Sequence, residues 1–336
     1  MNVPKPSESS RETIDRHLSA VYPSFALLAG VRLDVFTVLK DGPMTVEDLA
    51  QAMEVSAFKL ETLLYALVMA DLLVADDGNF ANTAEADFYL VQGRPSYIGR
   101  KIAYYAERWA ADLKTAESIR TGIPQGKLDF TSMSDSQLTA FYNSGNTAAI
   151  AAGCRLEETY DLCNFDSLLD VAGGSGGLAI GACQRCPELQ ATVIDLPTVT
   201  PITQRFVDEA GMDGRVKVLS LDVVDRAPES RYDVATVANL IQVLTRDQAR
   251  GALLNVGRAL VPRGVLFILG WVLDDSQLSP PEIAASNFAF LNIYDEGRAF
   301  TEAAHRVWLV EAGFSTFQRT LLPSGESIIR AEKADI

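Results

Sequence analysis

A glycine-rich turn at residues 173–177 is the stretch of this chain best suited to chemistry. An apolar run at 168–171 precedes the turn and is expected to form a buried parallel strand, and an apolar segment that can continue as a helix follows it. Four glycines in five residues let the backbone adopt positive φ values and approach a ligand closely. Strand, glycine loop and helix form the nucleotide-binding start of an α/β sheet, although a plain tight turn shares this pattern.

Two acidic residues stand at the ends of the next two predicted strands. Asp195 ends the run 191–195 and lies 19 residues after Gly176, where a carboxylate can accept hydrogen bonds from both hydroxyls of a ribose. Asp222 ends the run 216–222, where it can accept from the exocyclic amine of an adenine. The loop and the two acids together favour an adenosine-containing ligand.

The details of the loop distinguish between classes of cofactor. Ala179 stands where the dinucleotide pattern GxGxxG, counted from Gly174, requires its third glycine. The sequence fits better the acid-x-Gly-x-Gly-x-Gly loop of enzymes that use S-adenosylmethionine, with Asp170 as the acid. Ala172 replaces the first glycine of that loop, so we expect its φ angle to be negative.

Strands and helices alternate from residue 165 onward. Further strands are expected at 232–240 and 265–273, and residues 315–332 are expected to close the chain as a hairpin. This alternation predicts a mostly parallel sheet with one antiparallel strand. Helices are expected between and after these strands, at 246–260, 281–294 and 301–313.

The N-terminal part is predicted to be a small winged helix-turn-helix. The pattern consists of a helix over residues 17–40, two short helices capped by Thr45 and Ser56, and a hairpin at 73–82 with an Asp-Gly turn. The second short helix carries a single basic residue, Lys59, beside an acid. We therefore expect a winged helix that serves packing rather than DNA binding.

Composition excludes several classes of partner. The 336 residues include 29 Lys and Arg against 44 Asp and Glu, so the formal net charge is −15. This charge repels nucleic acids and anionic membranes, and no basic cluster offsets it. The first sixteen residues are polar and lack the apolar core of a secretory signal, and the apolar run 265–273 is too short to span a bilayer.

The four cysteines, at 154, 163, 183 and 186, are interpreted as those of a protein of the reducing cytoplasm, without a disulfide framework. Cys183-x-x-Cys186 has the spacing of a metal or redox pair, but it falls on a predicted helix without a second CxxC or a nearby histidine. We expect structural cysteines and no metal site.

At the level of whole segments, the chain resembles a known family. The segments are, in order, DVAGGSGG, VIDLPTV, LSLDV, RALVPRGVLFILGWVLDD and GRAFTEAAHRVWLVEAGF. They resemble the S-adenosylmethionine-dependent O-methyltransferases, among them plant caffeate, bacterial antibiotic and acetylserotonin enzymes. The resemblance implies an α/β fold with a Rossmann-like methyltransferase sheet and an antiparallel last strand, preceded by an all-helical winged-helix dimerisation domain. The implied domains are 1–100 for dimerisation, 101–165 as a helical connector and 166–336 for cofactor binding and methyl transfer.

The resemblance also implies how S-adenosylmethionine is bound. Gly173 and Gly174 would line its methionine part. Asp195 would hold the ribose, and Asp222 with Val223 would face the adenine. The full implied set is Ala172, Gly173, Gly174, Asp195, Leu196, Asp222, Val223, Asn239 and Tyr142. The implied partners are a small-molecule acceptor from secondary metabolism and a second copy of the chain, bound through the N-terminal domain.

One feature of the family is absent. Its members read Val-Leu-His-Asp-Trp after the fourth strand, with the histidine as general base, whereas this chain has Thr245 at that position. A threonine hydroxyl does not serve as a base at neutral pH. Thr245 with Gln248 instead forms a capping box for the next helix. The two histidines of the chain, His17 and His305, lie where the family has no base, so we expect both to be structural.

Methyl transfer does not require a histidine base. The sulfonium methyl group is strongly electrophilic, so an enzyme that aligns an ionised or carbon nucleophile with it gains much of the rate from orientation. Gln242 and Arg246 are candidates to orient an anionic oxygen, and the catalytic candidates are therefore Gln242, Thr245 and Arg246. The candidates for the acceptor site are Asn287, Phe290 and Tyr294.

Three functions remain open from the sequence. The first is methylation of a small aromatic or hydrophobic acceptor, more often on oxygen than on carbon. The second is a methyltransferase fold that binds S-adenosylmethionine but carries out a hydroxylation or a pericyclic step. The third is a winged-helix regulator that senses a small molecule, which the acidic charge disfavours.

Overall fold

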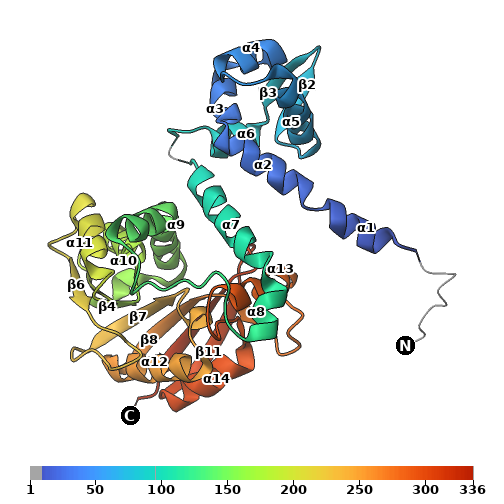
Figure 1. Ribbon diagram of the computed structural model, residues 1–336. Helices are drawn as coiled ribbons and strands as arrows, with labels where there is room; N and C mark the ends of the chain where they lie inside the picture. Colours follow the sequence, from blue (N-terminus) through green and yellow to red (C-terminus); the bar gives the residue numbers. More distant parts are fainter. Residues whose placement is uncertain (1–9, 95, 336) are drawn as a thin grey trace. The chain divides into compact units, whose positions relative to one another are not determined.

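The computed structural model describes residues 10–94 and 96–335, apart from the side chains of residues 100, 101, 103, 104 and 107 (Figure 1). The chain divides into two compact units, residues 1–107 and 108–336. This division differs from the three expected domains, because most of the expected connector, 101–165, belongs to the second unit. Each unit is described by itself below.

The first unit combines short helices with a small antiparallel sheet. The sheet has the order β1-β3-β2, and the hairpin predicted at 73–82 is formed by β2 and β3. The helices are α1 (Glu12–Ser19), α2 (Tyr22–Arg32), α3 (Val35–Val38), the 3-10 turn η2 (Leu39–Asp41), α4 (Val46–Ala52), α5 (Ala57–Met69), α6 (Ala84–Leu90) and the first half of α7 (Gly99–Asp112); the strands are β1 (Met44–Thr45), β2 (Leu73–Asp76) and β3 (Asn79–Asn82).

The helix expected over residues 17–40 is wrong in its continuity. The helical stretch begins earlier, at Glu12, and is broken before Tyr22 and again at Asp34. Asp34 has φ 57°, a left-handed conformation that ends one helix before the next begins. The cap at Thr45 is confirmed, since its side chain accepts a hydrogen bond from the amide of Asp48, whereas Ser56 precedes α5 without a side-chain cap.

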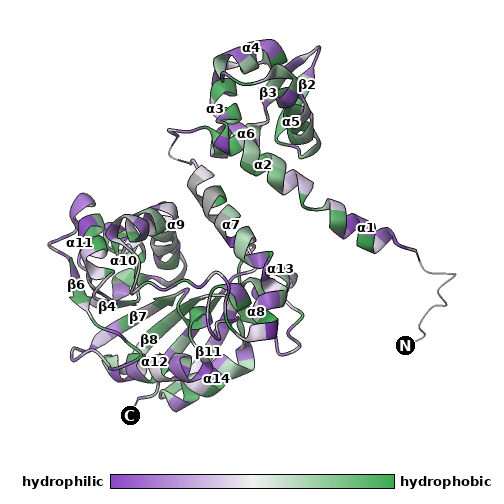
Figure 2. Ribbon diagram, in the orientation of Figure 1, coloured by the Kyte–Doolittle hydropathy of each residue, from purple (hydrophilic) through white to green (hydrophobic). Residues whose placement is uncertain are grey.

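The first unit leaves many large apolar side chains exposed. They include Ile14, Leu18, Tyr22, Phe25, Phe58 and Met69. These residues lie on α1, α2 and α5, whose ribbons include hydrophobic segments in Figure 2. A surface of this kind is typical of an interface with another protein chain.

The second unit is built on a seven-stranded sheet with the order β11-β12-β8-β7-β4-β5-β6. Strands β4 to β8 are parallel, and β12 pairs antiparallel with both β8 and β11. The predicted sheet with one antiparallel strand is therefore confirmed. The strands are β4 (Ser167–Val171), β5 (Gln190–Asp195), β6 (Val216–Ser220), β7 (Tyr232–Ala238), β8 (Leu260–Gly270), β11 (Phe314–Leu321) and β12 (Ser327–Lys333), and a short parallel pair is formed by β9 (Val272–Leu273) and β10 (Phe300–Thr301).

Helices cover both faces of this sheet (Figure 1). Neighbouring strand residues alternate between two cores: Leu168 packs with α9, α10 and α11, whereas Leu169 packs with α12 and α14. Burial on both faces explains why the parallel strands are continuously apolar. The helices are α8 (Thr115–Thr121), α9 (Asp135–Tyr160), the 3-10 turn η3 (Leu162–Asn164), α10 (Gly177–Arg185), α11 (Thr200–Glu209), η4 (Ile241–Val243), α12 (Arg246–Ala259), α13 (Pro281–Ser286), η5 (Asn287–Asn292) and α14 (Glu302–Glu311).

Helices α9 and α10 pack at backbone distance. A β-carbon on Gly181 would lie 2.1 Å from the carbonyl oxygen of Ile150, and one on Gly153 would lie 2.2 Å from that of Leu178. Only glycine permits this approach. The close packing places α9 against the helix that follows the glycine loop.

The expectation of four unpaired cysteines is wrong. Cys163 and Cys186 form a disulfide bond, while Cys154 and Cys183 are free. The sequence separation of 23 residues gave no local signal, because the two residues meet only through the packing of α9 on α10.

Among the described residues no single helix is both long and apolar enough to cross a bilayer. The segments Glu12–Arg32 and Val35–Asp41 reach that length and composition only together, as a pair bent by 58°.

Candidate cofactor and acceptor site

The candidate site lies along one edge of the large sheet, where strands β4 to β8 all have their carboxyl ends. The strand order β8-β7-β4-β5-β6 places the glycine loop after β4 at the centre of this edge. The chain proceeds from β4 outward to β6 on one side and from β7 to β8 on the other, so the direction of winding reverses between β4 and β7. Ligands of open α/β sheets bind at such a reversal.

The glycine loop departs from expectation at Ala172. Its φ is +52°, in the left-handed region, so the predicted negative angle is wrong. Gly174 has φ +59° and also lies under Tyr142, since a β-carbon there would come within 2.5 Å of Cε1 of that ring. A β-carbon on Gly173 would lie 2.6 Å from Oδ2 of Asp170. An alanine at 172 thus accepts strain of about 1–2 kcal/mol that a glycine would avoid, whereas positions 173 and 174 have no room for a side chain.

Asp195 fixes the glycine loop from the end of β5. Its Oδ2 accepts a hydrogen bond from the amide of Gly174 at 2.8 Å, and its Oδ1 accepts from the amide of Leu196 at 2.7 Å. Burial raises the pKa of Asp195 to about 6, and the two amides oppose that rise. Each carboxylate oxygen keeps a second lone pair, so Asp195 can hold the loop and still accept from ribose hydroxyls.

Asp170, the acid of the loop pattern, lies beneath the loop at the end of β4. It is buried, and its Oδ1 accepts a hydrogen bond from Oγ1 of Thr236 at 2.8 Å. Its Oδ2 has no hydrogen-bond partner. Burial raises the pKa of Asp170 to about 7, with a further rise from the charge of Asp195. Its role in the structure is to support the loop from below.

Tyr142, from α9, covers the glycine loop from the other side. Burial raises the pKa of its phenol well above the ordinary value, and the nearby Asp195 and Tyr294 add to this rise. The phenol therefore stays protonated at any physiological pH and can act as a hydrogen-bond donor. Residues from α9 and from the end of β5 thus meet at Gly174.

The adenine end of the predicted site is organised differently from the expectation. β6 ends at Ser220, and Asp222 lies in the following turn, where its Oδ1 accepts from the amide of Val224 at 2.9 Å. Val223 is buried in the core on the α12 face, and its carbonyl accepts from Nδ2 of Asn255 at 2.8 Å. Asp222 is thus oriented by its own turn.

At the other end of the edge, Asn239 and Gln242 follow β7. Asn239 has φ +55°, and its Oδ1 accepts a hydrogen bond from Nε2 of Gln242 at 2.9 Å. The buried Gln242 lies against the end of β8, where a β-carbon on Gly270 would be 2.7 Å from its Oε1. The amide of Gln242 is therefore held in place by the ends of two neighbouring strands.

An aromatic cluster lies near Gln242, because Trp271 follows Gly270, and a β-carbon on Gly297 would meet both Tyr294 and the carbonyl oxygen of Gln242. The rings of Trp271 and Phe290 have centroids 4.9 Å apart, and those of Phe290 and Tyr294 are 5.8 Å apart. Phe290 and Tyr294 were predicted, whereas Trp271 was missed. Its signal was available, because Trp271 directly follows the last residue of β8 and so stands on the same edge of the sheet.

Three predicted residues are not brought into this arrangement. Thr245 forms the predicted capping box with Gln248 at the start of α12, which is confirmed. Arg246 lies over the rings of Phe300 and Trp308, at 5.7 and 5.8 Å from their centroids. Oδ1 of Asn287 accepts from the amide of Ala299 at 2.7 Å. The side chains of these residues have structural partners.

The two histidines differ in their surroundings. His305 is 1% exposed, and its Nδ1 lies 2.9 Å from the carbonyl oxygen of Thr301 within α14. Burial lowers the pKa of His305 to about 4. His17 is exposed in the last turn of α1, in the first unit.

These residues suit S-adenosylmethionine. The loop has no side chains at positions 173 and 174, Asp195 keeps lone pairs for two hydroxyls, and Asn146 from α9 carries a buried amide oxygen without a partner beside Gly177. Asn146 was not predicted, and its place one helical turn after Tyr142 is the signal that could have found it. Gly173 and Gly174 would hold the methionine part, and Asp195 the ribose.

The fold and this edge together define a Rossmann-like cofactor-binding domain of the methyltransferase class. Residues 121–315, more than half of the chain, match the family model of the O-methyltransferase domain, and residues 16–92 match that of the O-methyltransferase dimerisation domain. The chain therefore belongs to the O-methyltransferase family and is an S-adenosylmethionine-dependent methyltransferase, as the sequence predicted.

Relatives of known function align over most of the chain. The 3-hydroxy-5-methyl-1-naphthoate 3-O-methyltransferase of Streptomyces sahachiroi is 27% identical over 326 residues, covering 94% of this chain and 93% of the relative. The N,N-dimethyltransferase OxyT of Streptomyces rimosus is 24% identical, with 89% of each chain covered. The structure of human N-acetylserotonin methyltransferase in complex with SAM has a TM-score of 0.81 at 20% identity and covers 98% of this chain and 100% of that one.

Proposed function

We propose that this enzyme methylates a hydroxyl group of a small aromatic or hydrophobic acceptor without a histidine general base. The observation that carries the proposal is the aromatic cluster of Trp271, Phe290 and Tyr294 beside the fixed amide of Gln242. These groups stand on the edge of the sheet next to the loop that would hold the methyl donor. Thr245, at the position of the family's histidine, is occupied by its capping box.

The chemistry requires alignment more than proton transfer. S-adenosylmethionine supplies a methyl group on a positively charged sulfur, which an ionised oxygen can attack directly. Gln242 would orient that oxygen by hydrogen bonding, because its amide is immobilised by Asn239 and by the end of β8. Holding the reacting groups in this way accounts for a large part of the rate in such transfers. The acceptor would lose its proton to solvent before it binds or as it binds.

The relatives support this choice among the alternatives. One is named for transfer to the 3-hydroxyl of a naphthoate and another for methylation of nitrogen, so the family uses more than one nucleophilic atom. All are named as methyltransferases, which does not favour a non-methylating activity or a regulator. The aromatic cluster favours methyl transfer to a hydroxyl group on an aromatic ring. Such a hydroxyl also ionises more readily than an aliphatic one.

The first unit would serve dimerisation and not DNA binding. Its match to the dimerisation domain and its exposed apolar side chains support a homodimer. Its order of short helices followed by a hairpin agrees with a winged helix, and the net charge of −15 argues against nucleic acid as a partner. Action in the cytoplasm on an intermediate of secondary metabolism stays a prediction.

A labelled-methyl assay tests the proposal. Purified protein is incubated with S-adenosylmethionine labelled in its methyl group and with a panel of phenols, naphthols and aliphatic alcohols. We expect transfer to ring hydroxyls. At saturating S-adenosylmethionine, kcat/KM for the acceptor should follow the pKa of the acceptor, with no ionisation of a histidine in the profile. If the pH profile of the parent contains an ionisation that is missing in His305→Gln, the proposal is contradicted. It is also contradicted if an acceptor is turned over while the methyl label stays on the cofactor.

A further inference from the structure

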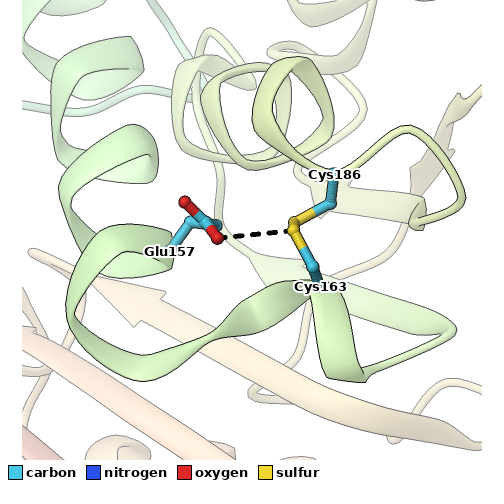
Figure 3. A group of neighbouring side chains, drawn as sticks. All are labelled: Glu157, Cys163 and Cys186. Atoms are coloured by element: carbon cyan, nitrogen blue, oxygen red, sulfur yellow. Dashed lines mark hydrogen bonds between the residues drawn. A yellow bond between two sulfur atoms is a disulfide. The ribbon is translucent and has the colours of Figure 1, made fainter.

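Three side chains with metal-binding atoms meet at the C-terminal end of α10, which is the end opposite to the glycine loop. Glu157 is on α9, Cys163 is in η3 and Cys186 follows the last residue of α10 (Figure 3). Their carboxylate and sulfur atoms all lie within 4.8 Å of one another. Cys186 is buried, Glu157 is partly buried and Cys163 is exposed, so the cluster opens to solvent on one side.

The carboxylate of Glu157 has an unusual neighbour. Its Oε1 lies 3.3 Å from Sγ of Cys163, the contact drawn in Figure 3. A sulfur atom in a disulfide carries no proton, so in the oxidised protein this contact is not a donated hydrogen bond. Within residues 10–94 and 96–335, Glu157 makes no ion pair, and Arg185, which precedes Cys186 in the chain, pairs with Glu158 instead. The carboxylate of Glu157 is therefore not neutralised by an ion pair in the described part of the chain.

We propose that, once its disulfide is reduced, the protein binds one zinc-like divalent cation through the thiolates of Cys163 and Cys186 and the carboxylate of Glu157. Sulfur and carboxylate are ligands that Zn²⁺ accepts, and three protein ligands leave a fourth tetrahedral position for water. A trialkylphosphine with water cleaves the disulfide to two thiols and is itself oxidised to the phosphine oxide. The cation then replaces the two thiol protons, which pass to the buffer.

The remaining cysteines do not belong to this site. Cys183, whose CxxC spacing with Cys186 drew attention in the sequence, is buried and donates to the carbonyl of Leu189. Burial raises the pKa of the Cys183 thiol to about 11, so it does not supply a thiolate at neutral pH. Cys154 donates to the carbonyl of Gly181 on another part of α10. The two cysteines of the proposed metal site are therefore Cys163 and Cys186, and not the CxxC pair Cys183 and Cys186.

The two states of the site would connect the same segments. The disulfide ties η3, which follows α9, to the end of α10, and the cation would tie the same two ends when the disulfide is reduced. Helix α10 begins at the glycine loop and α9 carries Tyr142 above it. The proposal is independent of the proposed acceptor and of methyl transfer itself.

Zinc binding by untagged, full-length protein tests the proposal. Competition with a chromophoric chelator is measured anaerobically in the phosphine-reduced protein and again after reoxidation. We expect one tight Zn²⁺ per chain in the reduced form and none in the oxidised form. Loss of a partner outside the first coordination shell weakens metal binding by ~10–100-fold, so Cys163→Ser, which removes a ligand, should weaken Zn²⁺ binding by more than that. Glu157→Gln should weaken Zn²⁺ binding by at least ~10-fold. Co²⁺ in place of Zn²⁺ should show thiolate-to-metal absorption that Cys163→Ser reduces.

Two matched variants serve as controls. Glu158→Gln changes the neighbouring carboxylate and Cys154→Ser changes a free cysteine, and both should bind Zn²⁺ as the reduced parent does. Melting temperature and affinity for S-adenosylhomocysteine show whether each variant is folded. Reduced protein without tight zinc binding would overturn the proposal, as would a loss in either control equal to that in Cys163→Ser. If Cys163→Ser does not fold, unchanged affinity in Glu157→Gln overturns it by itself.

Discussion

The two halves of the sheet edge, β4–β6 and β7–β8, differ in how their residues are held. In the half that would bind the cofactor, the decisive groups are backbone atoms of the glycine loop and one carboxylate, Asp195, that fixes them. In the half that would bind the acceptor, the decisive groups are side chains from the segments that follow β7 and β8 and from η5 and the residues after it. Several polar candidates there already have structural partners. An invariant ligand can be bound by a local backbone motif, whereas a variable ligand needs side chains gathered from separate segments.

The strongest test of the cofactor half is Gly174→Ala. The added β-carbon would meet the ring of Tyr142 at 2.5 Å in a left-handed backbone, so the loop must move. We expect the affinity for S-adenosylhomocysteine, measured by titration calorimetry, to fall more than ~100-fold. Gly211→Ala is the control, because Gly211 has φ +65° and nothing within 4 Å of the new carbon. Equal affinity in Gly174→Ala and the parent would contradict the assignment of the loop.

The acceptor half is tested by Gln242→Ala. Loss of the fixed amide should misplace the nucleophile, which costs about 100-fold in turnover when the displacement approaches an ångström. Affinity for S-adenosylhomocysteine should change less than about twofold, because the residue lies beyond the glycine loop. Gln248→Ala removes an exposed amide of the same type and should leave turnover per folded molecule unchanged. A large loss of cofactor affinity in Gln242→Ala would remove the distinction between the two halves.

The pH dependence of cofactor binding sharpens the comparison. The pKa of Asp195 is raised to about 6, and only its ionised form accepts from both ribose hydroxyls and both amides. Affinity should be constant above that pH and fall about tenfold between pH 7 and pH 5, as the carboxylate gains a proton. Asp195→Asn should bind more weakly and show no such step.

Asp170 is the control for this step, because its pKa is raised to about 7 and it lies next to Asp195. In Asp170→Asn the fall below pH 6 should remain. If the step disappears in Asp170→Asn and persists in Asp195→Asn, the titrating group is the support of the loop and not the ribose partner.

The smallest effect is expected for Thr245→Ala. Loss of a threonine cap costs about 1 kcal/mol of unfolding free energy, which denaturant titration measures. Turnover per folded molecule should stay within about twofold of the parent, because the hydroxyl is bonded to the amide of Gln248 at the start of α12. Activity lost in a variant of normal stability would assign chemistry to Thr245 and contradict a mechanism without an enzymic base.

Local patterns in the sequence were sufficient for a large part of this description. The glycine loop, the order of strands and helices in the second unit, the caps at Thr45 and Thr245, and the antiparallel last strand were all predicted and are confirmed. Each depends on contacts between residues close in the chain, where turn geometry and the alternation of apolar residues leave few choices. The exceptions among local predictions were the φ angle of Ala172, which the surrounding loop imposes, the cap at Ser56 and the continuity of the helix at 17–40.

The tertiary structure decided which side chains meet. Tyr142 covers Gly174 from a distant helix, Trp271 joins Phe290 at the end of β8, and Cys163 reaches Cys186. The same packing gives a structural partner to Arg246, a catalytic candidate, and to Asn287, a candidate for the acceptor site. Composition and spacing do not determine such contacts. The contacts depend on which helices pack closely together and on which loops the order of the strands brings to the same edge of the sheet. Chemistry held by the backbone could therefore be predicted from the sequence, while chemistry built from distant side chains was decided by the fold.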